Sequence, residues 1–348
     1  MALRFLGNKA KLVNEIVDIM IKITGLTKGS FIDLFSGTAI VSETMKIKGF
    51  DVISNDMLYS SFLLAQSKLL INSELTFTKL SNEVGNNIEQ VIKYLNNLKG
   101  EHGFFTENYS PNEVNNEIGR KYFITENALK IDAIRKQING WYKSNEITEL
   151  ERAYLISCLI YSVNDVANIS GTYGAYLKKW NKNSLNQVEL KPINITFSDG
   201  NYKVYNQDAN LLAKSLVPAD IVYIDPPYTK RQYSSYYHIL ETIARGDNPV
   251  IEGITGLRKD SSENTSKFCY KRHATNAMQE LINSISANHI FVSYSTDGHI
   301  SHEEMLELLG NKGEVDFWMK DYKRFKSNSL GNTDEKLKEI LYYVKVCK

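Results

Sequence analysis

This chain has few cysteines, no long apolar run and no excess of either charge. It has three cysteines in 348 residues, far apart and without CxxC spacing, at Cys158, Cys269 and Cys347. A disulfide framework or a zinc site is therefore not expected. The longest apolar runs, such as 153–163, are shorter than the roughly 20 residues that cross a bilayer, and no basic-then-apolar leader opens the sequence. We expect a cytoplasmic protein with no membrane partner and no metal.

The formal net charge of +1 neither requires nor excludes a nucleic-acid partner, because binding depends on where charge gathers. Two stretches, 171–191 and 318–329, each contain several cations and one acid. The cations are Lys178, Lys179, Lys182 and Lys191 in the first stretch, and Lys320, Lys323, Arg324 and Lys326 in the second. The pattern predicts two basic patches, although solvated lysines on exposed turns explain it equally well.

The first part of the chain has the pattern of an α/β sheet. Helical spacing over 11–23 is followed by a short buried-type strand, "SFIDLF", at 30–35. A helix over 36–50 and a second strand, "DVISND", at 51–56 come next. Strand, tight turn, helix and strand in this order begin a doubly wound α/β fold.

A long segment then interrupts this rhythm. Residues 75–200 are mostly polar and helical in tendency, and strands resume at 202–209, 219–228 and 289–295. Two further strands, over 315–325 and 339–346, predict a C-terminal hairpin. We therefore expect one sheet domain made of 1–74 and 201–348, with a largely helical insertion over 75–200.

Two strand ends carry candidate chemistry in the first half of the sheet. In "DLFSGTAIVS" the strand ends at Asp33, and a turn of small residues opens a helix, a place where backbone N–H groups meet ligands. Gly37 is the only glycine there, so the GxGxxG fingerprint is absent and pyrophosphate binding is disfavoured. Asp56 ends the next strand, where an acid accepts bonds from ribose hydroxyls. A tight turn with a helix cap remains the alternative.

A third strand end, "DIVYIDPPY", is more specific. Asp225 follows an apolar strand, at the edge where open α/β sheets bind ligands. Pro226 and Pro227 fix two φ angles and remove two N–H donors, which leaves a rigid group of acceptors. Such acceptors suit a substrate amine, and Tyr228 offers a flat face for a planar base.

These strings together resemble a known family. "RFLGNKAKL" (4–12), "FIDLFSGTA" (31–39), "SND" (54–56) and "DIVYIDPPY" (220–228) are similar to motifs of the Dam-like, alpha-group DNA adenine methyltransferases that use S-adenosylmethionine. That group has the cofactor motif first, the target-recognition region next and DPPY last, as here. The strings at 170–180 and 225–244 are similar to methyltransferases of restriction-modification systems.

The resemblance implies a fold and a set of site residues. The fold is a Rossmann-like methyltransferase sheet, mostly parallel with an antiparallel C-terminal hairpin, in which 75–200 is the target-recognition insertion. The cofactor-binding residues implied are Lys9, Asp33, Phe35, Ser36, Gly37 and Thr38 for the methionine part, Asp56 with Met57 for the ribose, and Asp208 for the adenine amine. The residues that grip the target adenine are Asp225, Pro226, Pro227 and Tyr228.

One position departs from the family pattern. Its usual FxGxG reads "FSGTA" here, with Ala39 in place of the last glycine. We expect Ala39 at the start of the helix, where alanine is tolerated.

The implied reaction is methyl transfer to the N6 amine of an adenine in duplex DNA. Hydrogen bonds from the amine to Asp225 and the Pro226 carbonyl would direct the nitrogen lone pair toward the methyl group. Because that amine is buried in a duplex, the base must rotate out and stack on Tyr228. DNA-binding candidates are Lys178, Lys179, Lys230, Arg231 and Tyr233. The run 245–275 is expected to be a mobile loop, and we expect His238 to have a packing role.

The expected partners are double-stranded DNA and a cognate restriction endonuclease that acts separately. The expected location of this protein is the bacterial cytoplasm, on the nucleoid. Methylation of RNA adenine, or a catalytically inactive nucleic-acid-binding relative, remain the alternatives. Cytosine and protein glutamine are disfavoured because the family pattern then has Ser or Asn in place of Asp225. A nicotinamide enzyme is disfavoured by the missing glycines.

Overall fold

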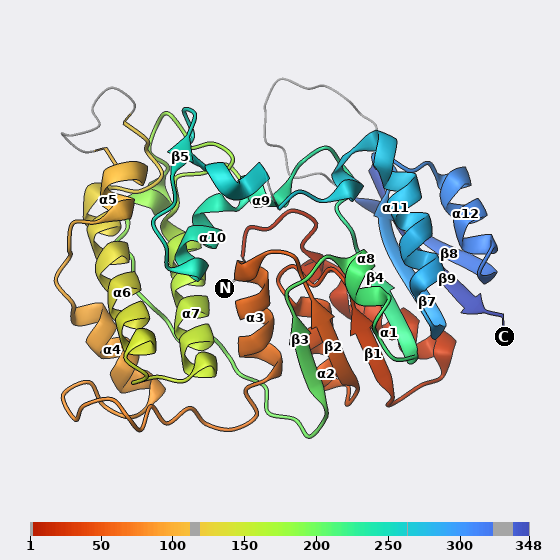
Figure 1. Cartoon of the computed structure of the whole chain (residues 1–348), viewed down its shortest axis with the longest axis horizontal. Coiled ribbons are helices and arrows are strands. Elements are labelled where there is room, and N and C mark those ends of the chain that lie inside the picture. The colour runs from red at the N-terminus through yellow and green to blue at the C-terminus, as the bar shows by residue number, and fades with distance from the viewer. Residues whose placement is uncertain (1–2, 112–118, 263, 323–336, 348) are drawn as a thin grey trace. The chain divides into compact units, whose positions relative to one another are not determined.

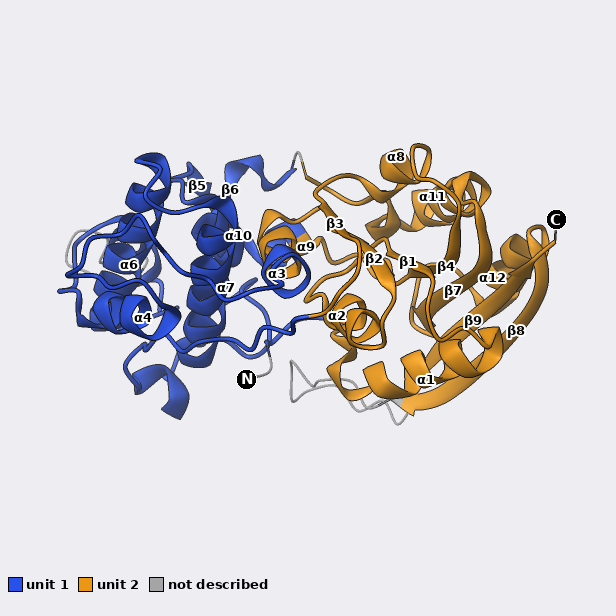
Figure 2. Ribbon diagram, turned by 90° about the horizontal axis from the view of Figure 1, so that it is seen from below, with its two compact units in different colours: residues 1–6, 66–197, 234–263 blue, residues 7–65, 198–233, 264–348 orange. Residues whose placement is uncertain are grey.

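The computed structural model describes residues 3–111, 119–262, 264–322 and 337–347. Lys323, Arg324 and Lys326 of the second predicted basic patch lie outside these residues. The chain forms two compact units (Figure 2). Unit 1 contains 1–6, 66–197 and 234–263, and unit 2 contains 7–65, 198–233 and 264–348.

Unit 2 is built on a seven-stranded sheet of the order β3-β2-β1-β4-β7-β9-β8 in the described residues (Figure 1). The strands are β1 (Ser30–Asp33), β2 (Asp51–Asn55), β3 (Tyr202–Tyr205), β4 (Ala219–Ile224), β7 (Ala287–Ser295), β8 (Gly313–Tyr322) and β9 (Leu337–Val346). The first five of these in spatial order pair in parallel, and β9 pairs antiparallel with both β7 and β8. The predicted mostly parallel sheet with an antiparallel C-terminal hairpin is confirmed.

The central strands are parallel because both of their faces are covered. In β4, "ADIVYI", five of six residues are buried, as expected for an apolar strand between two helical layers. Apolar side chains of β4 and β7 form a core with α8 (Ala209–Ala213), α11 (Lys271–Ser284) and α12 (His302–Gly310). On the opposite face α1 (Val13–Thr24) packs with α2 (Ile40–Ile47). The short helices of this unit are η1 (Lys9–Lys11) and η4 (Lys267–Cys269).

Unit 1 is mainly helical. Its helices are α4 (Ile88–Asn97), α5 (Phe104–Tyr109), α6 (Thr125–Lys143), α7 (Glu149–Val166), α10 (His238–Arg245), η2 (Lys182–Leu185) and η3 (Lys259–Ser262), with a hairpin of β5 (Ile251–Glu252) and β6 (Leu257–Arg258). Two helices, α3 (Tyr59–Leu69) and α9 (Tyr233–Tyr236), run across the unit boundaries. Helix α7 is buried over most of its length because α6 and α10 both pack against it. It begins in a capping box, in which Thr148 and Glu151 satisfy each other's backbone N–H groups.

The units divide the chain differently from the expected domains: the helical unit begins at 66 instead of 75 and ends at 197 instead of 200, and it gains two further segments. Residues 1–6 and 234–263 belong to the helical unit rather than to the sheet. In the first segment, the Arg4 guanidinium donates to the carbonyl of Ile169 at 3.1 Å. In the second, the Arg152 guanidinium donates to the carbonyl of Ala244 at 2.6 Å. Half-buried Arg4 and buried Arg152 therefore tie these segments to the helical unit, which local sequence patterns do not reveal.

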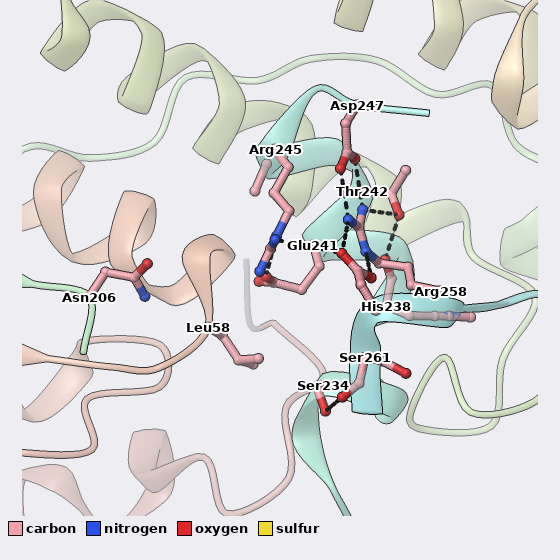
Figure 3. Close-up of polar contacts among 12 residues, drawn as sticks. Leu58, Asn206, Ser234, His238, Glu241, Thr242, Arg245, Asp247, Arg258 and Ser261 are labelled. Carbon is pink, nitrogen blue, oxygen red and sulfur yellow. Dashed lines mark hydrogen bonds and ion pairs between the residues drawn. The ribbon is translucent and has the colours of Figure 1, made fainter. Parts of the chain in front are cut away.

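The run 245–275 is more ordered than the sequence suggests. It contains the β5–β6 hairpin, η3, η4 and the start of α11, and Arg258 is only 3% exposed. The Arg258 guanidinium donates to Asp247 at 2.7 Å from each of two nitrogens, to Asp260 at 3.0 and 2.8 Å, and to Thr242 at 3.2 Å (Figure 3). Arg258 therefore holds unit 1 together and is not available at the surface.

His238 has the packing role that the sequence predicts. Its ring is fully buried, with the rings of Tyr109 and Tyr122 at 5.7 and 5.9 Å in edge-on contact. Burial lowers the pKa of His238 to about 3, so the imidazole is neutral. Within the described residues neither ring nitrogen has a hydrogen-bond partner.

The described helices include none that is long and apolar enough to cross a membrane.

Replacing Arg258 tests its structural role. Arg258→Met removes the cation of Asp247 and leaves Asp260 with only Arg245, 3.8 Å away, and because both acids are about two-fifths exposed, water replaces part of the loss. We expect the free energy of unfolding at pH 7 to fall by about 2 kcal/mol in urea titrations. Arg258 lowers the pKa of Asp260, so this difference should shrink as the pH falls through the ordinary aspartate range.

Lys259→Met is the matched control, because Lys259 is the exposed neighbour of Arg258. Its effect should stay below about 0.5 kcal/mol. Equal effects of the two substitutions would show that the buried network contributes nothing.

Candidate functional site

The site of unit 2 lies where β1 and β4 run side by side. The chain continues from β1 to β2 and β3 on one side, and from β4 to β7 on the other. Ligands of open α/β sheets bind at the carboxyl ends of the strands at such a reversal. Asp33 ends β1 opposite Tyr223 of β4, and Asp225 follows two residues later. Pairing of the strands thus brings the first and third predicted strand ends to one edge.

A buried lysine connects Asp225 to a second carboxylate. Lys9 Nζ lies 2.9 Å from Asp225 Oδ1 and 3.8 Å from Glu339 Oε2, and it donates to the carbonyl of Gly7 at 3.2 Å. The Lys9 side chain is 5% exposed, that of Asp225 15% and that of Glu339 11%. We call Lys9, Asp225 and Glu339 the charge cluster. It has two acids for one cation.

The pKa values of both Asp225 and Lys9 are raised in the charge cluster. Burial, with a smaller contribution from Glu339, raises the pKa of Asp225 to about 6, against the lowering effect of Lys9. Burial alone would lower the pKa of Lys9, but Asp225 and Glu339 outweigh it and the pKa is raised. Lys9 is therefore cationic at neutral pH, and Asp225 is an ionised but unusually basic carboxylate.

Asp33 is buried with one open oxygen. Its Oδ2 accepts from Ser42 Oγ at 2.7 Å, and Ser42 also lies 3.2 Å from Ser54 Oγ. Asp33 Oδ1 has no hydrogen-bond partner among the described residues. Burial raises the pKa of Asp33 to about 7, partly offset by Ser42. An unpaired buried acceptor is costly, so this oxygen suits a ligand that brings a donor or a positive charge.

The turn after Asp33 is tight and partly strained. Gly37 has φ of 52°, and Ala39 is the residue before α2 with φ of 55° and ψ of 28°. Ala39 stands at the start of the helix as expected, but helix propensity does not apply to a left-handed residue, where a Cβ costs roughly 1 kcal/mol. Ser36 and Thr38 are buried in the same turn.

Asp56 closes this turn from the second strand. Its two oxygens accept from the backbone N–H groups of Gly37 and Leu58, both at 2.8 Å. The Asn206 amide donates to the carbonyls of Asp56 and Met57 at 2.8 and 2.9 Å. The carboxylate is therefore fixed, and Met57 is half-buried beside it.

Asp208, the predicted cofactor residue that follows β3, lies at the same edge of the sheet. Asp208 caps α8, and its Oδ1 accepts from the backbone N–H of Leu211 at 3.0 Å. The Phe35 ring meets Phe268 of η4 edge-on, with centroids 5.2 Å apart. Asn55 joins the segments, because its amide donates to the carbonyls of Leu34 at 3.0 Å and Gln207 at 3.2 Å.

Tyr228 is held from two sides. Its hydroxyl donates to Glu339 Oε1 at 3.3 Å, and its carbonyl accepts from the backbone N–H of His299 at 2.9 Å. Its ring meets Tyr294 edge-on at 5.5 Å. Pro226 is buried, and Pro227 and Tyr228 are half-buried. The prolines and these contacts leave the aromatic ring little freedom.

The predicted DNA contacts are divided between the units. Lys178 and Lys179 are exposed in unit 1. Lys230 is exposed in unit 2, where Arg231 and Tyr233 are half-buried. The segment of these three is fixed by Gln232, whose amide accepts from the backbone N–H of Ser266 at 2.9 Å and donates to its carbonyl at 3.1 Å. The catalytic and cofactor candidates, in contrast, all lie in unit 2.

Sequence reasoning missed several residues that contact the candidates. Asn55 stands inside "SND" and could have been noticed there as a polar residue at a strand end. Ser42 and Phe268 have no comparable signal, and Glu339 belongs to a strand more than 100 residues after Asp225. The structure also groups no three His, Cys, Asp or Glu side chains as a metal site in the part of the chain that it describes.

Comparison with known proteins gives a consistent picture. The family described as D12 class N6 adenine-specific DNA methyltransferase matches residues 5–306. Type II methyltransferase M.FokI of Planomicrobium okeanokoites is 41% identical over 350 residues, which cover 98% of this chain and 52% of that protein. Type II methyltransferase M.NlaIII of Neisseria lactamica is 32% identical over 99% of this chain and 98% of that protein.

The matching relatives include one of nearly the same length as this chain and others that are much longer. Modification methylase StsI of Streptococcus sanguinis is 37% identical over 98% of this chain but 52% of its own length. The chain spans about half the length of these first curated relatives, M.FokI and StsI, and nearly all of M.NlaIII.

Removing the cation from the charge cluster should destabilise unit 2. Lys9→Met leaves Asp225 and Glu339 buried without their cation, and we expect a loss of about 3 kcal/mol in the free energy of unfolding at pH 8. Without Lys9 the pKa of Asp225 rises further. A buried acid with a raised pKa is penalised only while ionised, so the loss should decrease as the pH falls from 8 to 6.

Lys11→Met in the same turn is the control, since Lys11 is exposed. Urea titrations of both variants at the two pH values check the prediction. A loss that stays the same at pH 8 and pH 6 would contradict the electrostatic explanation.

Proposed function

We propose that this chain, which belongs to the family of D12 class N6 adenine-specific DNA methyltransferases, transfers a methyl group from S-adenosylmethionine to the N6 amine of an adenine in duplex DNA. The observation that carries the proposal is the acceptor group of Asp225, Pro226 and Tyr228 at the end of β4, beside the buried Asp33 at the end of β1.

The residues around β1 and β2 fit the cofactor. The open oxygen of Asp33 suits the cationic amino group of its methionine part, and the turn of Phe35, Ser36, Gly37 and Thr38 borders the same place. Asp56 with Met57 suits the ribose hydroxyls. Asp208 suits the adenine amine, with Phe35 and Phe268 as an apolar wall. Lys9, which the resemblance assigns to the methionine part, also pairs with Asp225 and Glu339.

When bound, the cofactor supplies an activated methyl group, whose bond to sulfur breaks with the electron pair left on sulfur. Asp225 and the Pro226 carbonyl accept hydrogen bonds from the substrate amine, which directs its lone pair at the methyl carbon as the new carbon–nitrogen bond forms. The nitrogen then carries a positive charge and must lose a proton. The Asp225 carboxylate, with its pKa raised to about 6, can accept that proton at neutral pH.

The substrate adenine has to leave the duplex to reach these acceptors. Tyr228, fixed by Glu339 and Tyr294, offers the face on which the extruded base stacks. Lys178, Lys179, Lys230, Arg231 and Tyr233 are proposed to hold the DNA backbone. The helical unit 1 is proposed to read the target sequence.

The biological setting is proposed from the relatives. Two of them are named Type II methyltransferases and one a modification methylase. This chain would then protect DNA in a bacterial restriction-modification system, in the cytoplasm and on the nucleoid, with a cognate endonuclease acting as a separate activity.

Substitution of Asp225 tests the proposal. Asp225→Ala should reduce transfer of labelled methyl groups to unmodified genomic DNA by at least about 10³-fold, because it removes the acceptor that orients and deprotonates the amine. Binding of S-adenosylmethionine, measured by calorimetry, should remain. Digestion of the product DNA to nucleosides should place the label in N6-methyladenine.

Three outcomes would contradict the proposal. Label on RNA but not on any unmodified DNA would indicate an RNA methyltransferase. Cofactor binding without transfer by the wild-type protein would indicate a binding protein. Binding of NAD in place of the sulfonium compound would indicate a dehydrogenase.

A further inference from the structure

We propose that Glu339 is a positioning residue for methyl transfer: by sharing Lys9 with Asp225 and fixing the hydroxyl of Tyr228, it keeps Asp225 basic and the stacking ring in place. The inference rests on the proposed function for its rate prediction only. Its electrostatic part can be measured without cofactor or DNA.

Glu339 contacts Tyr228 of the DPPY segment directly and reaches Asp225 through their shared partner Lys9. Its Oε1 accepts from the Tyr228 hydroxyl at 3.3 Å, and its Oε2 lies 3.8 Å from Lys9 Nζ. Oε2 is buried and has no hydrogen-bond partner among the described residues. The Glu339 carboxylate therefore contacts both Lys9, the cation paired with Asp225, and the hydroxyl of Tyr228.

Strand pairing fixes the position of this carboxylate. Glu339 is the third residue of β9 and lies opposite Ser295 of β7 and Lys320 of β8. Just before it, Lys338 is held to Thr296 by two bonds of 3.1 Å, from the Lys338 N–H to Thr296 Oγ1 and from the Thr296 N–H to the Lys338 carbonyl. A slip by one residue would point Glu339 to the other face, so the register determines its contacts.

The balance of charge explains what Glu339 does. Lys9 alone would lower the pKa of Asp225 and make it a poorer acceptor. A second carboxylate next to Lys9 weakens that effect, and Glu339 raises the pKa of Asp225. An excess of negative charge is also favourable where the attacking nitrogen becomes positive.

Other ionisable groups face the charge cluster and have to be kept constant. Lys320, although opposite Glu339 on β8, is paired with Glu15 of α1. The groups coupled electrostatically to the cluster or to Tyr228 are Tyr223 of β4, Asp33 of β1 and Asp297 after β7. Single substitutions at position 339 leave all of them unchanged.

The first experiment titrates Asp225 in the cofactor-free protein. Aspartate is labelled with ¹³C at its carboxyl carbon, and the signal of Asp225 is assigned by its loss in Asp225→Asn. In Glu339→Gln, which keeps the size of the side chain and an acceptor for Tyr228, the midpoint of Asp225 should move to lower pH. Glu314→Gln is the control, because Glu314 is an exposed acid on β8, and it should leave the midpoint unchanged.

The second experiment measures single-turnover methylation of unmodified DNA against pH. Glu339→Gln should lower the rate at pH 7.5 about tenfold, because a less basic acceptor activates the amine less, and move the acidic limb of the profile to lower pH. Glu339→Ala should lose more, because Tyr228 is also released. Tyr228→Phe should lower the rate but leave the acidic limb where it is in the wild type.

The results separate the inference from the proposed function. An unchanged Asp225 midpoint in Glu339→Gln overturns the inference, even if the wild-type protein methylates DNA. A shifted midpoint together with no methylation by the wild type supports the electrostatic role and overturns the proposed function. Equal thermal unfolding of Glu339→Gln and wild type is the expected check that a loss of rate does not reflect unfolding.

Discussion

The ion pair between Lys9 and Asp225 is the interaction on which the site of unit 2 depends. Asp225 follows a buried strand, and a carboxylate there is costly unless a cation compensates it. Lys9 supplies that cation from η1, more than 200 residues earlier in the chain. Because Glu339 of β9 shares the same ammonium group, three distant segments meet at one point. Strand pairing therefore holds these charged residues together, and their attraction in turn stabilises the arrangement of the strands.

The other strand ends also combine a cost in stability with features that suit ligand binding. Asp33 is buried with an open oxygen, and Ala39 adopts a left-handed conformation in the adjoining turn. Both features raise the energy of the folded state, and strain of this kind gathers at functional sites. The surrounding bonds, from Ser42 to Asp33 and from Gly37 to Asp56, hold the turn in place. The site is thus organised before a ligand arrives.

In unit 1, buried arginines fix the β5–β6 hairpin and the segments beside it. Arg120 donates to the carbonyls of Ile254 and Gly253 at 2.9 and 3.0 Å, which fixes the tip of the β5–β6 hairpin. Arg258 holds the base of the same hairpin through Asp247 and Asp260. Short irregular segments can be rigid when their carbonyls and carboxylates have such partners. This rigidity distinguishes the segment 245–262 from the mobile loop that its composition suggests.

The sequence by itself determined the sheet, its order of motifs and the acids at its strand ends. Apolar strands followed by Asp33, Asp56 or Asp225 are local patterns, and parallel strands bring their ends to one edge whatever lies between them. Only the tertiary structure decided the contacts of Glu339, the burial of Arg258 and the left-handed backbone at Ala39. These depend on strand register and on the packing of segments far apart in the chain, whose energies no short stretch of sequence contains.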